Sequence, residues 1–167
     1  MNSWRQQFGM TLMETLIYIA LVGLLIVGLT SFSQTITQAR NKAYAAQEVQ
    51  ANLRLIFNTL SQKIRGAEAV VTPTVGASAD SLVLDMPGAE PNLTFSVTDG
   101  ALRLTAGGGN PVIVSAKAVT IDYLTFLNTG YAGQRYEIKT NFLISYRHSS
   151  NDPAFDFSQA VETAFSL

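Results

Sequence analysis

The chain has 167 residues with a formal net charge of −1, and 47% of its residues are hydrophobic while 14% are charged. It contains no cysteine, which excludes disulfide bonds, zinc ribbons, iron–sulfur centres, thiol catalysis and the acylated anchor of a lipoprotein. This length allows one membrane-anchored helix and one globular domain of about 100 residues.

The first predicted element is an apolar helix that begins next to a single carboxylate. Residues 15–39 contain no Asp, Glu, Lys or Arg, and Glu14 lies at their start. As a helix, this run extends about 37 Å, enough to cross a bilayer. A carboxylate at the edge of such a run is costly unless a partner neutralises it, so Glu14 is a candidate functional residue.

The residues before Glu14 follow a specific pattern. A short polar leader, MNSWRQQFG, ends at Gly9, and MTLMETLIYIALVGLL follows it. This N-terminus resembles the type IV prepilin signal, which has Gly at the end of a basic leader, then a hydrophobic residue and Thr-Leu, with Glu fifth. The sequence departs from the family in two ways: Met10 stands where Phe is usual, and Arg5 is the only basic side chain of the leader.

The resemblance implies a processing and assembly pathway. A prepilin peptidase would cut after Gly9 and methylate the new amine of Met10, and Glu14 would face the amine of a neighbouring subunit. The implied partners are this peptidase, other pilin or pseudopilin subunits and the inner-membrane assembly machinery. The chain would be held in the inner (cytoplasmic) membrane with its head outside the cytoplasm, and would then enter a pilus or pseudopilus at the cell surface or in the periplasm. This orientation follows from the resemblance, because the charges flanking the apolar run do not distinguish its two ends.

Two other kinds of N-terminal segment compete with this interpretation. A conventional secretory signal requires a small-x-small cleavage site after its apolar core, and residues 30–34 (TSFSQ) match that site poorly. A plain single-pass anchor remains open but does not explain Glu14. The prepilin interpretation is preferred.

The helix is expected to continue as an amphipathic segment up to Gly66. No Gly or Pro interrupts residues 38–65, and apolar side chains recur at the spacing of one helix face. These side chains are Val49, Leu53, Ile56, Phe57, Leu60 and Ile64. The predicted organisation is therefore a leader (1–9), a transmembrane or filament-core helix (10–33), an amphipathic helix (34–66) and a β-rich head (67–167).

Strands are predicted in the rest of the chain. The predicted strands are residues 81–86, 93–97, 101–105, 111–115, 119–128 and 135–147. The Asp99-Gly100 dipeptide predicts a tight hairpin, and the last residues, 155–167, fit a final strand or a short helix.

Alternation indicates how these strands pack. Val119, Ile121 and Tyr123 alternate with polar residues, as do Tyr136 and Ile138. This pattern is typical of an antiparallel sheet with one buried face. The predicted fold class is α+β, a long N-terminal helix packed on an antiparallel head, which is the pilin-like architecture.

The head offers little for chemistry. His148 is the only histidine and is interpreted as a surface residue at a strand end. Metal ligation by dispersed acids such as Asp80, Asp85 or Asp152 is left open without support, and no cofactor, metal site or enzymatic activity is predicted. From Gly66 to the end, five basic residues face ten acidic ones, which argues against nucleic acid as a partner.

The sequence thus predicts a type IV pilin-like structural subunit, a minor pilin or a pseudopilin, that serves adhesion, motility, secretion or DNA uptake. The alternative is a single-pass membrane-anchored receptor or adhesin whose head binds a ligand and which does not polymerise. The first hypothesis needs Gly9 and Glu14, and the second needs neither.

Overall fold

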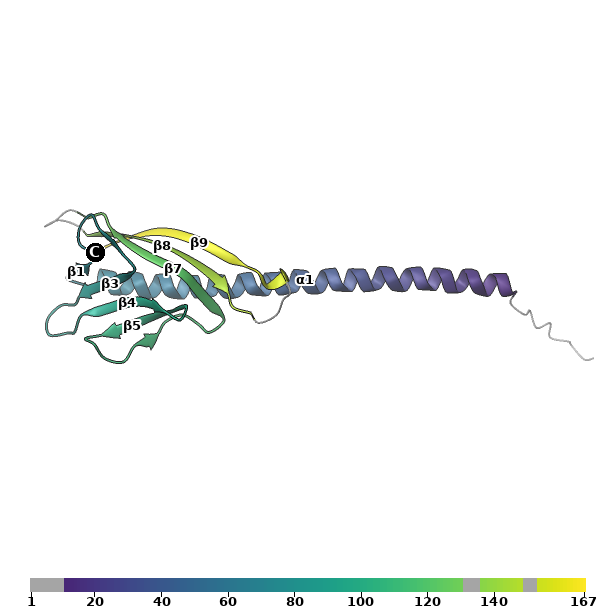
Figure 1. Cartoon of the computed structure of the whole chain (residues 1–167), viewed down its shortest axis with the longest axis horizontal. Coiled ribbons are helices and arrows are strands. Elements are labelled where there is room, and N and C mark those ends of the chain that lie inside the picture. Colours follow the sequence, from purple (N-terminus) through teal and green to yellow (C-terminus); the bar gives the residue numbers. More distant parts are fainter. Residues whose placement is uncertain (1–10, 131–135, 149–152) are drawn as a thin grey trace, which may run out of the picture. The chain divides into compact units, whose positions relative to one another are not determined.

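The computed structural model describes residues 11–130, 136–148 and 153–167. The chain divides into two compact units, residues 1–40 and 41–167, and the long helix α1 (Leu12–Arg65) contributes to both (Figure 1). The other elements are β1 (Ala69–Thr72), β2 (Ser78–Ala79), β3 (Ser81–Asp85), β4 (Leu93–Thr98), β5 (Ala101–Ala106), β6 (Val112–Ile113), β7 (Val119–Asn128), β8 (Glu137–Tyr146), the 3-10 helix η1 (Pro153–Phe155) and β9 (Ser158–Ser166).

The C-terminal part of α1 is the amphipathic helix that the sequence predicts. Its buried residues are Ala45, Val49, Asn52, Leu53, Ile56, Leu60 and Ile64. They recur every three or four positions, so one stripe faces the head and the other side faces solvent. The helix ends at Arg65, and the N–H of Gly66 donates to the Gln62 carbonyl at 3.1 Å. The predicted end is confirmed, and so is the predicted stripe except for Phe57, which is only partly buried.

The strands form two antiparallel sheets. One sheet has the order β1-β3-β4-β5-β6, and the other has the order β2-β7-β8-β9. A long helix packed on antiparallel strands confirms the predicted α+β class. The sequence suggested an antiparallel sheet without dividing its strands, whereas the head has two.

The division between the sheets occurs after β6. The hydroxyl of Ser115 accepts a hydrogen bond from the Leu102 N–H at 3.1 Å, in place of a backbone carbonyl. The next amide, that of Ala116, donates to the Asn52 side chain of α1 at 2.8 Å. These bonds turn the chain toward the helix, so the strand predicted at 111–115 is reduced to the two residues of β6.

The hairpin between β4 and β5 matches its prediction. Thr98 pairs with Ala101, which leaves Asp99 and Gly100 as a two-residue loop. Their φ angles are 55° and 70°, and positive φ at both central residues is the type I′ turn that suits the twist of paired strands.

A bulge in β7 changes which side chains face the core. Ile121 pairs with Ile144, but Tyr123 pairs with Leu143, so Asp122 is an extra residue in the ladder. An extra residue shifts the alternation by one position. Tyr123 is consequently 44% exposed whereas Leu124 is buried, and the prediction that Tyr123 shares the buried face of Ile121 is wrong.

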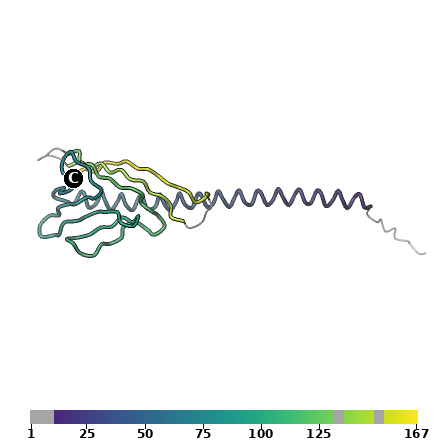
Figure 2. Tube along the Cα trace, viewed as in Figure 1, coloured from purple at the N-terminus to yellow at the C-terminus, as the bar shows by residue number. Residues whose placement is uncertain are grey.

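The C-terminal segment forms a strand rather than a short helix. The strand β9 pairs with β8 from Ser145↔Ser158 to Glu137↔Ser166, and Figure 2 shows β7, β8 and β9 running side by side. The strands β1 and β2 were not predicted, because four and two residues are too short to show alternation.

One hydrophobic core joins α1 to both sheets. Its largest fully buried side chains include Phe95 from β4, Phe126 from β7 and Phe142 from β8. They belong to the same cluster as Ile56 and Leu60 of α1. The head is therefore held together by apolar packing around the second half of the helix.

Candidate functional site

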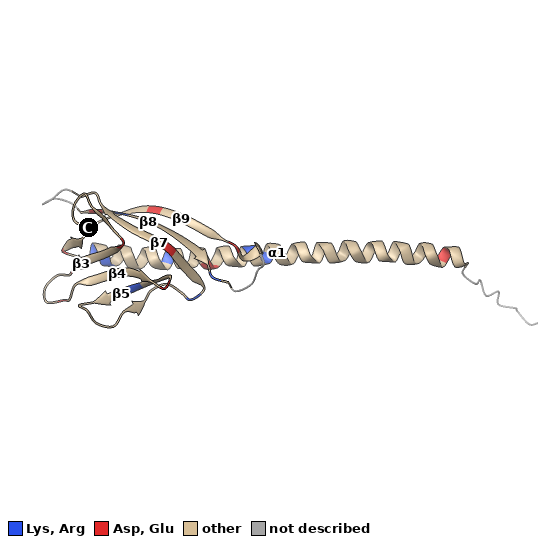
Figure 3. Cartoon of the chain, viewed as in Figure 1, with Lys and Arg blue, Asp and Glu red and all other residues tan. Residues whose placement is uncertain are grey.

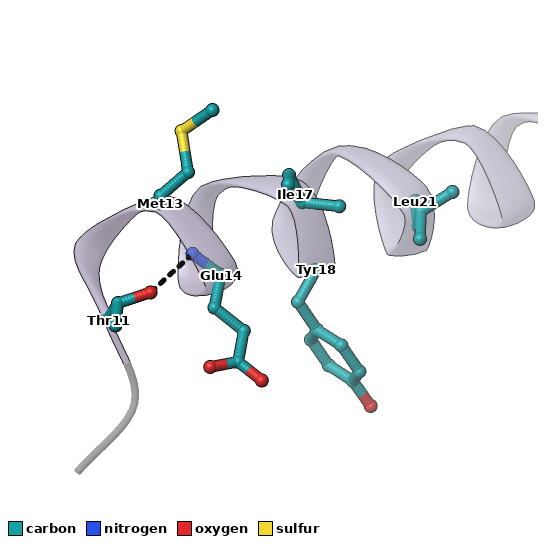
Figure 4. Close-up of a pocket in the computed structure, with 6 residues that line it drawn as sticks. All are labelled: Thr11, Met13, Glu14, Ile17, Tyr18 and Leu21. Atoms are coloured by element: carbon teal, nitrogen blue, oxygen red, sulfur yellow. Dashed lines mark hydrogen bonds between the residues drawn. The ribbon is translucent and has the colours of Figure 1, made fainter.

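Glu14 lies in the first turn of α1, directly after the residue that caps the helix. The Thr11 carbonyl accepts the N–H groups of Glu14 at 3.0 Å and Thr15 at 3.1 Å. The Thr11 hydroxyl also accepts the Glu14 N–H, at 3.3 Å (Figure 4). Thr at the N-cap with Glu three residues later is the capping-box pattern. Thr11 is a site residue that the sequence analysis missed, although the Thr-x-x-Glu spacing indicates it.

Capping accounts for the backbone of Glu14 but not for its carboxylate. A negative charge in the first turn favours the helix by about 0.3–1 kcal/mol, far less than the cost of placing the carboxylate among apolar atoms. Among the residues that the structure describes, the Glu14 carboxylate has no hydrogen-bond or ion-pair partner. The predicted candidate residue therefore carries a charge that the described part of the chain leaves uncompensated.

The helix surface next to Glu14 is exposed and apolar. Its large exposed side chains are Leu12, Met13, Leu16, Ile17, Tyr18, Ile19, Leu21, Val22, Leu24, Leu25, Ile26, Val27, Leu29 and Phe32. Figure 3 shows the long uncharged stretch that follows the first turn of the helix. The helix is long and apolar enough to cross a membrane, with a mean hydropathy of 2.3 in its most apolar window.

The threonine hydroxyls of this segment are satisfied within the helix itself. Each donates to a backbone carbonyl three or four residues earlier, the usual bond of a helical Thr. The pairs are Thr15 with Leu12, Thr30 with Ile26, Thr35 with Ser31 and Thr37 with Ser33. These groups need no external partner, whereas the Glu14 carboxylate does.

A shallow hollow of about 420 Å³ lies beside Glu14. It is lined by Thr11, Met13, Glu14, Ile17, Tyr18 and Leu21 (Figure 4). Glu14 and Tyr18 project from the same side of the helix, and Met13 projects from another. Five of these residues belong to α1 and Thr11 caps it, so the hollow has a single wall and can enclose a charge only when a second element packs against it.

The predicted cleavage and methylation positions, Gly9 and Met10, lie outside the described residues. The structure therefore gives no geometry for the scissile bond or for the amine that the prediction places opposite Glu14.

His148 is less exposed than the sequence suggested. It follows the end of β8, as predicted, but its side chain is only 21% exposed, and its Nε2 lies 2.8 Å from Oδ1 of Asp156. Its ring stacks on Tyr146 with centroids 6.2 Å apart and contacts Phe155 at 5.9 Å. The pair joins the end of β8 to the segment before β9. No sequence signal indicates it, because the β8–β9 register creates the contact.

Tyr44 of α1 packs edge-on against this cluster, with its ring centroid 6.1 Å from that of Tyr146. The Glu48 carboxylate one turn away, and next the Tyr146 hydroxyl, raise the pKa of the Tyr44 phenol above its usual value. The cluster thus ties the helix to β8 through contacts between aromatic rings.

The dispersed acids of the head do not form a metal site among the described residues. Within 11–130, 136–148 and 153–167, no group of three or more His, Asp or Glu side chains is placed to hold a metal ion. Asp80 and Asp85 therefore belong to no such group, and Asp152 lies outside the described residues.

The chain matches no protein-family model, no curated protein and no solved structure.

Proposed function

We propose that the protein is a type IV pilin-like structural subunit, a minor pilin or a pseudopilin, that is stored in a membrane and assembled into a pilus or pseudopilus. In this proposal a prepilin peptidase removes residues 1–9 and methylates the amine of Met10. The helix from residue 10 to about residue 33 then moves from the lipid into the filament core, and the head forms the outer surface.

The observation that carries the proposal is the uncompensated carboxylate of Glu14 at the start of an exposed and uncharged helix surface. In lipid or in a filament core, that carboxylate requires a cation close by, because removing one partner of a buried pair costs about 3–5 kcal/mol. The described residues supply none. The methylated amine of a neighbouring subunit is such a cation. Every processed chain carries this amine only four residues before Glu14, at nearly the same level along the helix.

The geometry of the hollow beside Glu14 agrees with such a neighbour. A hollow with one helical wall is closed by a second helix that packs along the same face. If each subunit offers Glu14 to one neighbour and its own amine to another, the contact is head-to-tail, and a head-to-tail contact that does not close generates a helical filament.

The resemblance of the N-terminus to prepilin signals and the α+β head support the same proposal. The helix is apolar enough to store the subunit in a bilayer before assembly. The head would lie outside the cytoplasm, and the assembled filament would stand at the cell surface or in the periplasm. Adhesion, motility, secretion and DNA uptake are the activities that such filaments serve.

Intact mass spectrometry of the protein recovered from its native membrane tests the processing step. The expected chain lacks residues 1–9 and carries one extra methyl group. Replacing Gly9 by Leu is expected to leave the precursor uncut, since a side chain at the scissile residue blocks close approach of the peptidase. A full-length wild-type chain in cells with an active peptidase would contradict the proposal and favour a single-pass receptor.

A further inference from the structure

A pocket of about 260 Å³ lies in the head where the two sheets meet. Its lining includes Asp99 of the β4–β5 turn, Arg103 of β5, Lys117 between β6 and β7, and Arg147 after β8. Ile113 and Val119 add apolar walls. Three cationic side chains from three separate segments of the chain therefore line one small cavity, which we call the cationic pocket.

The cationic pocket concentrates positive charge in an acidic domain. From Gly66 to the end of the chain, the basic residues are Arg103, Lys117, Arg135, Lys139 and Arg147, and ten residues are acidic. Arg103, Lys117 and Arg147 line the pocket, and Asp99 is the one acid in its lining among the residues that the structure describes. A local excess of positive charge attracts an anion to this site.

The contacts within the pocket leave donors unused. The Asp99 carboxylate accepts from Arg103 Nη2 at 3.1 Å, and Arg147 donates from Nε to Thr120 Oγ1 at 2.9 Å. The Nε of Arg103 is buried and has no acceptor. Within the described residues, the Lys117 ammonium forms no ion pair or hydrogen bond. Because Arg103 Nε is closed to solvent, the donor that a ligand in the pocket can use is the Lys117 ammonium. A ligand with acceptor oxygens can bond this ammonium, and a negative charge on it is favoured beside Arg103 and Arg147.

The pocket is held in shape by the turn that forms its edge. A Cβ on Gly100 would lie 2.6 Å from Thr120 Cγ2 and 3.3 Å from Arg147 Nη2, so the turn packs closely against both residues. The Gly100 carbonyl also accepts the Ile121 N–H at 2.9 Å, which links the two sheets. Binding therefore requires little ordering of the site.

We propose that the cationic pocket binds the carboxylate of an acidic side chain on the head of a neighbouring filament subunit. The cavity is smaller than sites that enclose a drug-sized ligand, and it fits one carboxylate on a short apolar stem. A head with twice as many acidic as basic residues supplies such side chains at its surface. The identity of the occupant rests on the proposed filament function, whereas the preference for a carboxylate does not.

The preference for a carboxylate is tested on the full chain in detergent micelles, with butyrate as the probe and its uncharged analogue butyramide as the control. Butyrate is expected to produce a saturable shift of the Arg103 Nε–H resonance, and butyramide none. Lys117→Gln is expected to weaken butyrate binding roughly ten-fold, and the matched variant Lys139→Gln to leave it unchanged. Equal responses to the two probes, or equal effects of the two variants, would overturn the proposal.

The identity of the occupant is tested by treating assembled filaments with a carbodiimide. This reagent joins a carboxylate to a lysine in contact with it. An amide between Lys117 and an acidic residue of another chain is expected, and it should disappear in Lys117→Arg. A processed, incorporated chain with only an internal Lys117–Asp99 amide, or with none, would overturn the proposal. A chain that binds butyrate but is neither processed nor incorporated would overturn the filament function and with it the neighbouring subunit as occupant.

Discussion

The two parts of helix α1 differ in where their apolar side chains are buried. In the N-terminal part, side chains such as Leu24 are 73% exposed, and hydrophobic residues surround the helix on all sides. In the C-terminal part, a single stripe is buried against the sheets, and Leu60 within it is fully buried. Leucine side chains thus contribute to the stability of the head in the C-terminal part of the helix and not in the N-terminal part.

This difference indicates that the first part of the helix is suited to an apolar environment that the described residues do not provide. An apolar surface of this size on a soluble protein marks a membrane or protein interface. The threonines of this part keep their hydroxyls bonded to the backbone, so the segment can enter an apolar environment with few unsatisfied groups. The Glu14 carboxylate is the exception. Substitutions at Glu14 therefore give the strongest test of how the first part of the helix differs from the second.

The largest effect is expected from Glu14→Gln. Gln keeps the size of Glu and is accepted at its capping position, so the helix start should persist while the charge is lost. If Glu14 pairs with the amine of a neighbouring subunit as proposed, that amine would be left unpaired at a cost of about 3–5 kcal/mol, and incorporation into filaments should fall by roughly 100-fold or more. Quantitative immunoblots of sheared filaments and of membranes measure the distribution.

Glu14→Asp, which retains the charge, and Glu48→Gln, which removes a carboxylate from the head-facing part of the same helix, are the controls for this variant. Both should still reach the membrane and retain measurable incorporation. If Glu14→Gln assembles as well as the wild type, the negative charge is not needed for assembly and the proposed pairing is wrong.

Two separate leucine-to-alanine variants, one in each part of the helix, test this difference directly. Leu60→Ala should lower the free energy of unfolding of the head by about 2–5 kcal/mol, because it opens a cavity in the core. Leu24→Ala should change it by less than about 0.5 kcal/mol, as expected away from packed features. Urea unfolding of the full chain in detergent, followed by near-UV circular dichroism, compares the two. Equal losses would mean that Leu24 also packs within the chain.

The features of the fold that could be predicted are those fixed by neighbouring residues. The helix ends directly before Gly66, as the sequence indicates, and positive φ at Asp99 and Gly100 accounts for the predicted hairpin. The bulge at Asp122 and the division into two sheets depend on partners far along the chain, such as Asn52 with Ala116. No local pattern encodes these contacts.

The candidate sites likewise could be predicted only where neighbouring residues define them. Glu14 could be found from the sequence because its unusual property is its position beside an uncharged run. The cationic pocket could not, since Arg103, Lys117 and Arg147 are widely separated and are brought together only by the packing of the two sheets. The contact of His148 with Asp156 likewise requires the pairing of β8 with β9.

Two separate glycine substitutions, one in the head and one in the N-terminal part of α1, extend the comparison to the β4–β5 turn. Gly100→Ala should destabilise the head by about 2 kcal/mol or more, because the residue has positive φ and an added Cβ would lie against Thr120. Gly28→Ala meets no atom within 4 Å and should leave the unfolding of the head unchanged. Thermal unfolding of the two full-length variants distinguishes them, and a stable Gly100→Ala head would show that the turn relaxes.

The smallest effect is expected from Asn52→Ala, which tests how the helix directs the chain between the sheets. Asn52 accepts the Ala116 N–H at 2.8 Å and donates to the Glu48 carbonyl at 2.9 Å. Its removal leaves the Ala116 amide unpaired, at a cost of roughly 1–2 kcal/mol. Asn58→Ala, an exposed position on the same helix, should be within about 0.5 kcal/mol of the wild type. Faster hydrogen exchange of the Ala116 amide in Asn52→Ala, but not in Asn58→Ala, would show that the Asn52 side chain holds the segment that passes from one sheet to the other. Unchanged exchange would mean that Ser115 and the contacts between the sheets hold this segment.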